Sequence, residues 1–309
     1  MFNSCTFEGM ASGKSLHYAA ALSAFCIWGT FSLALRPLKV VPSIDILFWR
    51  VFVAVVVLWA YLFAFRRSLL GMGLARWEAA TRSERLRAVR LTLLGGFLLT
   101  CNWLVFMQTV NHVSVKSAAY AYLVCPVLTS LMAVFVLQET LSRAQWVALG
   151  IALLSCLVLA LFAFRDLLFS MIVAISYAGF LISQRHNTLL PRPLLLAFQL
   201  LTSAFVLLPL FPFLAGPLPA LSSFPWLITV VAVVFTILPL LLNLFALNAL
   251  PSGTMGMLLY VNPLINFALA VLWFHEPMAA FQWLAYALVL ISVVVYHLPQ
   301  LRKAVSNYN

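Results

Sequence analysis

The chain is a series of long apolar runs separated by short polar joints. A helix that spans a bilayer needs about 20 mostly apolar residues, because about 30 Å of hydrocarbon must be covered at about 1.5 Å per residue. Ten runs meet this length, so the pattern predicts an all-α polytopic membrane protein with ten transmembrane helices. The expected spans cover residues 16–35, 43–65, 91–110, 113–137, 144–163, 167–184, 194–215, 225–249, 252–274 and 279–298.

The composition agrees with this pattern. Of the 309 residues, 65% are hydrophobic and 8% are charged, whereas a soluble domain carries roughly 45–50% apolar and about 25% charged residues. Four of the five cysteines lie inside apolar runs and none forms a CxxC pair, so we expect small core residues and not disulfides or metal ligands. The first fifteen residues lack the features of a signal peptide, and both Met1 and Met10 are possible starts.

One stretch occurs twice in the chain. Residues 115–159 align without a gap on residues 252–296 at a shift of 137 positions. Each copy is an apolar run with a proline in its middle, followed by an acidic joint, a Gln-Trp pair and a second apolar run. Duplicated hydrophobic halves that each contain a proline-broken helix are typical of secondary transporters. The matching positions are Pro126 and Pro263, Glu139 and Glu276, Gln145 and Gln282, and Trp146 and Trp283.

Positive charge is concentrated in the segment from Arg66 to Arg90. This segment holds seven arginines, and its Trp77 and leucines predict a short amphipathic helix at the membrane surface. With both termini in the cytoplasm, the inside segments collect thirteen lysines and arginines and the outside segments three. The positive-inside rule therefore predicts cytoplasmic termini in a lipid bilayer, and it accounts for the net charge of +11 without a nucleic-acid partner.

The ten spans divide into two sets of five. Because five is odd, the second set enters the membrane in the opposite orientation to the first. Inverted-topology repeats of this kind give alternating access when one half rocks against the other. We expect a cytoplasmic tail at 1–15, a first five-helix repeat at 16–164 with the basic loop 66–90, a second five-helix repeat at 165–298, and a cytoplasmic tail at 299–309.

Several short motifs follow one another in a recognisable order over roughly residues 16–298. They are Trp28-Gly29, Ile46-Leu47-Phe48-Trp49-Arg50-Val51, Gly95-Gly96, Asn102-Trp103-Leu104, Val110-Asn111-His112, Pro126, Glu139, Gln145-Trp146, Pro239, Pro263 and Glu276. In these motifs the chain resembles the EamA family of the drug/metabolite transporter superfamily, specifically its RarD-like subgroup. The resemblance implies ten spans, a central substrate cavity between the halves, and movement of small metabolites or drugs across an inner or plasma membrane.

The chain departs from the subgroup at two places. Cys125 stands where the subgroup usually has an asparagine before the first-half proline, although Asn262 precedes the second-half proline. Lys116-Ser117 replaces an acidic residue early in the fourth span. Both changes fall where the wall of the implied cavity lies.

Pro126 and Pro263 lie in the middle of expected spans. Each removes one helix hydrogen bond and frees the carbonyl four residues before it, on Tyr122 and Leu259. In hydrocarbon such a carbonyl is tolerated only where protein or a water-filled cavity receives it. The paired prolines therefore indicate hinges beside a substrate path, with packing kinks as the alternative.

Polar and aromatic side chains within the spans are candidates for substrate contact. Asparagines can line a cavity or bond between helices, and aromatic rings can stack on a flat or cationic substrate or simply pack. Asn262 and Asn266 share one helix face because they are four residues apart. The candidate substrate-binding residues are Arg50, Asn102, Trp103, Tyr120, Tyr122, Asn243, Tyr260, Asn262 and Asn266.

Arg50 is a permanent charge about seven residues inside an apolar run, or about 10 Å deep at 1.5 Å per residue. Three interpretations are open. Arg50 can extend outward to the lipid headgroups, join a structural network with carbonyls of a broken helix, or bind the carboxylate or phosphate of an anionic substrate. Asp45 is not a good direct partner, because five residues place it well around the helix.

Other chemistry is weakly represented. Glu139 and Glu276 fit proton coupling or, more simply, an acid beside the N-terminus of the next helix. No P-loop and no cluster of acids or histidines at membrane depth is present, so we expect no cofactor and no enzyme activity. The sequence favours a secondary carrier, an exporter or permease for a small organic solute, over a membrane-embedded enzyme or a scaffold or receptor. It leaves monomer and homodimer open.

The predicted topology can be tested with two single cysteines. Ser83 lies in the basic loop and Gly216 between the seventh and eighth spans, so the ten-span inverted arrangement puts them on opposite sides of the membrane. In oriented vesicles we expect an impermeant thiol reagent to label Ser83→Cys and Gly216→Cys from opposite sides. Labelling of both from one side would contradict the arrangement.

Overall fold

The fold was analysed in a computed structural model of the chain. The structure describes residues 4–112, 115–162, 164–214, 216, 221–273, 275 and 277–306, with side chains described outside 4–14, 107–121, 162–170 and 300–306. Within these ranges every regular element is a helix. The prediction of an all-helical chain is therefore confirmed for the described residues, and the described cysteines form no disulfide.

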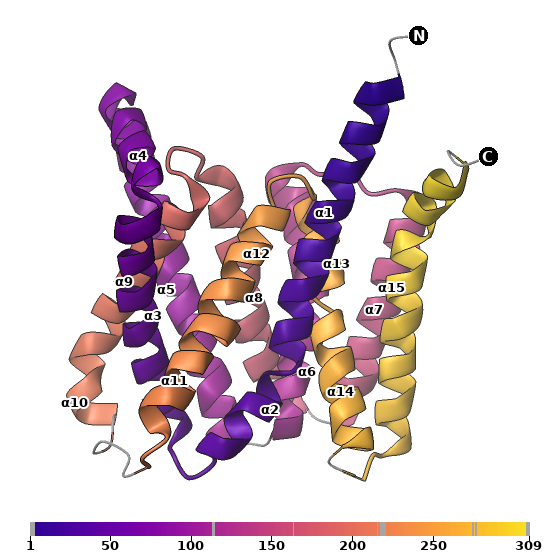
Figure 1. The fold of residues 1–309 in the computed structure, drawn as a ribbon. Coiled ribbons are helices and arrows are strands. Elements are labelled where there is room, and N and C mark those ends of the chain that lie inside the picture. The colour runs from indigo at the N-terminus through magenta and orange to yellow at the C-terminus, as the bar shows by residue number, and fades with distance from the viewer. Residues whose placement is uncertain are drawn as a thin grey trace.

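The helices follow one another with short connections, as the apolar runs predict. Most of them cross the bundle side by side (Figure 1). Their bounds are α1 Ser4–Gly29, α2 Phe31–Leu35, η1 Arg36–Leu38, α3 Ser43–Phe65, α4 Arg67–Ala79, α5 Arg82–His112, α6 Val115–Leu137, α7 Arg143–Phe162, α8 Phe164–His186, α9 Arg192–Leu207, η2 Leu208–Leu210, α10 Phe211–Leu214, α11 Phe224–Ala232, η3 Val233–Ile237, α12 Leu238–Ala246, α13 Ser252–Leu258, α14 Val261–Leu272 and α15 Ala280–Ser306.

Eight stretches of the described residues are helical, long and apolar enough to cross a membrane. Two further expected spans coincide with α6 and α8, and α6 contributes the shorter apolar helix Tyr122–Leu137. The full count of ten crossings stays a prediction. The eight stretches are Ser15–Leu38, Ser43–Phe65, Arg82–Phe106, Arg143–Leu161, Arg192–Leu214, Phe224–Ala246, Ser252–Leu272 and Ala280–Pro299.

The start of α1, the end of α15 and the basic helix α4 lie at the same end of the bundle (Figure 1). The surface helix predicted between Arg66 and Arg90 is present as α4, which turns Leu69, Leu70 and Gly73 toward the bundle. Arg85 at the start of α5 donates to the last carbonyls of α4, on Trp77 at 2.8 Å and on Glu78 at 2.8 Å. This arginine therefore holds the two basic helices together.

Three helices begin with a cap in which the side chain of one residue accepts the backbone N–H of the residue three positions before it. The Thr81 backbone N–H donates to Glu84 at 2.8 Å, and the bonds from Thr81 lower the pKa of the Glu84 carboxyl. Gln145 and Gln282 do the same for their own helices, accepting from the backbone N–H of Ser142 at 2.9 Å and of Ala279 at 2.8 Å. The duplicated glutamine of the repeat is thus the reciprocal half of a capping box at the start of α7 and of α15.

Pro239 breaks the regular bonding of the eighth expected span. The π-helical turn η3 precedes it, and the proline lacks the N–H that would bond the Phe235 carbonyl. The indole N–H of Trp28 in α1 donates to that carbonyl at 3.1 Å. A carbonyl freed in one half of the chain is therefore bonded by a side chain from the other half.

Candidate functional site

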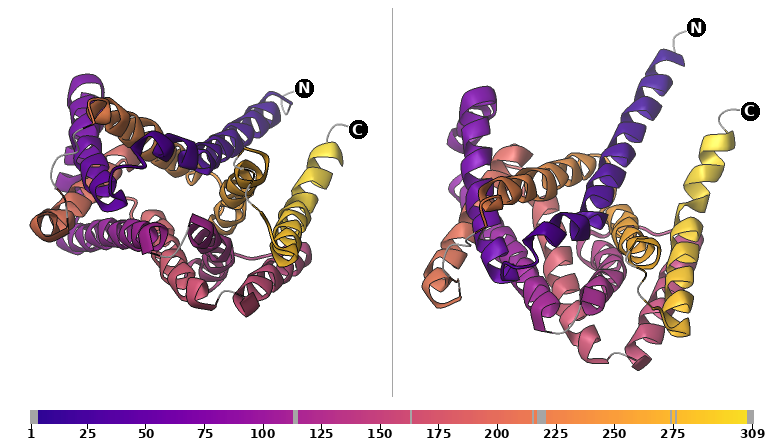
Figure 2. Two further views of the ribbon diagram at one scale, coloured as in Figure 1. Left: turned by 90° about the horizontal axis from the view of Figure 1, so that it is seen from below. Right: turned by 60° about the horizontal axis from the view of Figure 1, so that its bottom comes forward.

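The two copies of the repeat pack directly on each other. α6 packs on α13 and α14, and α7 packs on α15, which Figure 2 shows as neighbouring ribbons in both views. The Tyr260 hydroxyl donates to the Leu123 carbonyl at 3.0 Å, and the Ser130 hydroxyl donates to the Gly253 carbonyl at 3.4 Å. Later residues of α6 thus meet earlier residues of α13, so the two helices run antiparallel.

A glycine allows this close approach. A Cβ atom on Gly256 would lie 3.0 Å from the Cβ of Thr129 and 3.3 Å from the carbonyl oxygen of Pro126. Any larger side chain would push α13 away from the proline-containing part of α6. The repeat interface, meaning the contact of α6 with α13, therefore centres on the first of the predicted hinge residues.

The two prolines break their helices to different extents. α6 is continuous through Pro126, whereas α13 ends at Leu258 and α14 begins at Val261, just before Pro263. The Leu259 carbonyl that Pro263 frees accepts the backbone N–H of Asn262 at 3.0 Å. In α6 two side chains of other segments donate to the Leu123 carbonyl, Tyr260 and, at 3.4 Å, Cys156 Sγ. The sequence had indicated the carbonyl one residue earlier, on Tyr122.

Glu139 joins the repeat interface at the end of the bundle where α13 begins. Its carboxylate accepts the backbone N–H groups of Ser252 at 2.8 Å and Gly253 at 3.0 Å. The acid was expected beside the next helix, α7, but its bonds go to the N-terminus of α13. Gln138, with φ of 57°, turns the chain at the end of α6 and so directs Glu139 across the interface.

The counterpart of Gln138 in the second copy is His275, with φ of 50°. These two are the non-glycine residues with positive φ in the described part of the chain, and the repeat shift relates them. Both copies therefore end their proline-containing helix with the same left-handed turn. Glu276, which follows His275, lies outside the described residues.

Five residues from five helices form what we call the central cluster: Arg50, Trp103, Tyr122, Tyr177 and Asn243. The Arg50 guanidinium carbon lies 4.7 Å from the ring centroid of Trp103. Electrostatic interactions join Tyr122 to Arg50 and to Tyr177, and Asn243 Nδ2 donates to the Tyr177 hydroxyl at 3.4 Å. The cluster links α3, α5 and α6 of the first half to α8 and α12 of the second.

The other candidates have separate surroundings. Asn102 donates to the Val173 carbonyl at 2.8 Å. This is a bond between helices, one of the two roles that the sequence left open for the asparagines. Asn266 donates to Asn262 Oδ1 at 2.8 Å, so these two satisfy each other on α14. The side chain of Tyr120 lies outside the described ones. Substrate contact stays a prediction for all nine candidates.

One residue of this region, Tyr177, was not among the sequence candidates. Tyr177 is the hub that bonds Asn243, and Trp28 packs edge-on against it with ring centroids 6.4 Å apart. Trp28 belongs to a motif that the sequence did reveal, but Tyr177 is one polar ring in an apolar run. Its partners Trp28 and Asn243 come from α1 and α12, which are far from it in the sequence.

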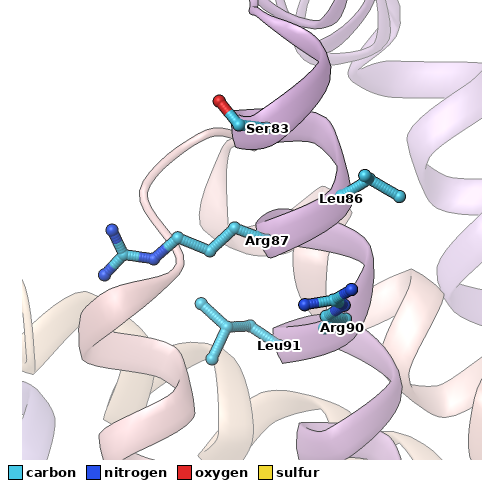
Figure 3. Close-up of a pocket in the computed structure, with 5 residues that line it drawn as sticks. All are labelled: Ser83, Leu86, Arg87, Arg90 and Leu91. Carbon is cyan, nitrogen blue, oxygen red and sulfur yellow. The ribbon is translucent and has the colours of Figure 1, made fainter.

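A pocket of about 360 Å³ lies away from these residues, on the first turns of α5. Figure 3 shows that Ser83, Leu86, Arg87, Arg90 and Leu91 all extend from this one helix. Four of the five side chains are exposed, and two carry positive charge. A groove of this kind in the basic segment fits contact with anionic headgroups, and none of the candidate residues lines it.

Comparison with known proteins gives a consistent result. The family model described as EamA-like transporter family matches residues 15–161 and 165–297. The uncharacterized transporter YojE of Bacillus subtilis is 27% identical over 296 residues, covering 94% of this chain and 95% of that protein. Protein RarD of Streptomyces exfoliatus is 29% identical over 300 residues, covering 91% and 88%. One crystal structure shares the fold with a TM-score of 0.67 at 17% identity, covering 92% of this chain and 98% of the other.

Glu139 offers a direct test of the repeat interface. Glu139→Gln removes the charge and leaves one acceptor oxygen for two backbone N–H groups, so we expect a loss of about 1.5–3 kcal/mol in stability, the range for hydrogen bonds to charged groups. The unfolding midpoint in detergent would measure it. Glu78→Gln, an exposed acid on α4, serves as the control and should change little. Equal midpoints for Glu139→Gln and the parent protein would contradict the assignment.

Proposed function

The chain belongs to the EamA-like transporter family, and from this membership we propose that it is a secondary carrier, an exporter or permease, that moves a small organic metabolite or drug by alternating access. Family membership and the apolar helices make the chain a multi-pass membrane transporter. The carrier mechanism goes further. It is carried by one observation, the antiparallel packing of the proline-containing helix α6 on α13, which leads into the proline-containing helix α14 of the second copy.

The same contact supports the proposed inversion of the two halves. Tyr260 and Leu123 are 137 residues apart, which is the repeat shift, and they are hydrogen-bonded to each other. In a two-fold arrangement a residue meets its own counterpart only close to the axis. The bond therefore supports a pseudo-two-fold axis that passes through the repeat interface beside Pro126, as expected for ten spans in two inverted sets of five.

The proposed motion is a rocking of one half against the other around this axis. The bonds of Glu139 to Ser252 and Gly253 hold the repeat interface closed at the end of the bundle where α1 begins and α15 ends (Figure 1). In the positive-inside orientation this end faces the cytoplasm of a cell with the protein in its inner or plasma membrane. Opening toward the cytoplasm would then separate Glu139 from α13.

Transport can be tested in proteoliposomes with a panel of amino acids, organic acids, nucleosides and drugs. We expect accumulation or exchange of some solutes and not of others, relative to vesicles without protein. Because a carrier saturates, the rate should level off as the solute concentration rises. No solute-specific difference across the panel would weigh against a carrier and leave the scaffold or receptor alternative.

The two prolines test the mechanism in the same vesicles. If they act as hinges, Pro126→Ala and Pro263→Ala should slow transport by roughly tenfold, about 1.4 kcal/mol of barrier, while insertion and folding are kept. Pro212→Ala, an exposed proline of α10 without a counterpart in the repeat, is the matched control and should transport normally. Full rates in both hinge variants would reduce the prolines to packing kinks.

A further inference from the structure

Arg50 is a buried charge that the described residues do not neutralise. It lies in α3 with 4% of its surface exposed, and its buried Nε has no hydrogen-bond partner. Among the described residues no hydrogen bond or ion pair to its guanidinium is found. Other arginines behave differently: Arg66, Arg67, Arg85, Arg185 and Arg192 each donate at least one hydrogen bond to oxygen.

The neighbours of Arg50 are aromatic. Its guanidinium carbon lies 4.7 Å from the ring centroid of Trp103 and 5.7 Å from that of Phe31. Cation–π contacts stabilise a buried cation only in part, because removing an ion from water costs more than such contacts return. Rings also leave the five N–H donors of a guanidinium without conventional acceptors.

The acids of the chain are engaged elsewhere where the structure describes them. Asp45, on the same helix, is 2% exposed and accepts the backbone N–H of Gly216 at 2.9 Å. Glu84 bonds Thr81, and Glu139 bonds α13. Glu78 lies exposed on α4. The side chains of Glu8, Asp166 and Glu276 lie outside the described ones.

We propose that Arg50, with Trp103 and Phe31, binds the carboxylate of a small aromatic acid, which is the class of solute carried. The inference rests on the proposed carrier function, because it names the solute of that same path. A planar guanidinium fork matches a carboxylate with two parallel hydrogen bonds, and the flanking rings can stack on a flat apolar group. The ring centroids of Phe31 and Phe235 are 5.5 Å apart, so this site borders the second half of the chain.

Binding of benzoate and of its neutral isostere benzamide to the purified full chain tests the proposal. Calorimetry or the fluorescence of the protein's tryptophans in nanodiscs would report the two affinities. We expect benzoate to bind at least about tenfold more tightly than benzamide, and also more tightly than acetate, which has the charge but no ring. Equal affinities for benzoate and benzamide, or no binding of either, would overturn the proposal.

Substitution at Arg50 separates recognition from packing. Arg50→Gln should lower benzoate affinity to that of benzamide and leave benzamide unchanged, and Arg50→Lys should weaken benzoate by roughly tenfold because a point charge lacks the fork. Lys39→Gln removes an exposed charge near the same end of α3 and should change neither affinity. A benzoate preference kept in full by Arg50→Gln would overturn the proposal. If Arg50→Gln does not fold, the proposal is tested by the benzoate affinity of Arg50→Lys and by the benzoate and benzamide affinities of the parent protein.

Transport of the same compounds distinguishes this proposal from the carrier function. If the protein transports neutral solutes but binds benzoate no more tightly than benzamide, the carrier function stands and the proposed carboxylate site at Arg50 is overturned. A benzoate preference that depends on Arg50, with no solute moved in vesicles, overturns the carrier and leaves the binding site. Faster benzoate than benzamide uptake, lost in Arg50→Gln, supports both.

Discussion

In hydrocarbon every backbone carbonyl must find a donor within the protein, and this constraint organises the contact between the two halves. Pro239 leaves the Phe235 carbonyl to the indole of Trp28, and near Pro126 the Leu123 carbonyl accepts from Tyr260 and Cys156. In both cases the donor comes from another helix. Pro239 therefore creates an acceptor that ties its helix to a distant part of the sequence.

The same constraint explains why the two copies of the repeat differ. Around Pro263 the chain satisfies its own backbone, since the Asn262 N–H bonds the Leu259 carbonyl and the helix restarts at Val261. Around Pro126 the helix stays continuous and the bonds come from neighbours. A duplicated sequence feature thus gives one broken helix and one continuous helix.

The fold was largely predictable from the sequence, and the site was not. The lengths of the apolar runs predicted where the helices form. The repeat at a shift of 137 residues identified Gln145 and Gln282, each of which caps its own helix. Partners far apart in the chain carry no such signal. Glu139 was expected beside α7, which begins four residues later. It bonds Ser252 instead, more than one hundred residues on, because the left-handed turn at Gln138 directs it there. Tyr177 was missed because one tyrosine in an apolar helix shows no preferred neighbour.

Buried polar groups are only partly hydrogen-bonded in two regions of the interior, the repeat interface and the central cluster. Along the repeat interface the Glu139 carboxylate, Tyr260 and Ser130 are hydrogen-bonded across the contact, whereas the hydroxyls of Thr129 and Ser252 are buried without a hydrogen-bond partner. In the central cluster the balance is incomplete, since Arg50 Nε and Asn243 Oδ1 are both buried without a hydrogen-bond partner. A buried donor and a buried acceptor left open cost stability in the empty protein. In the carrier proposed above, a solute that bonds these groups would recover part of that cost on binding.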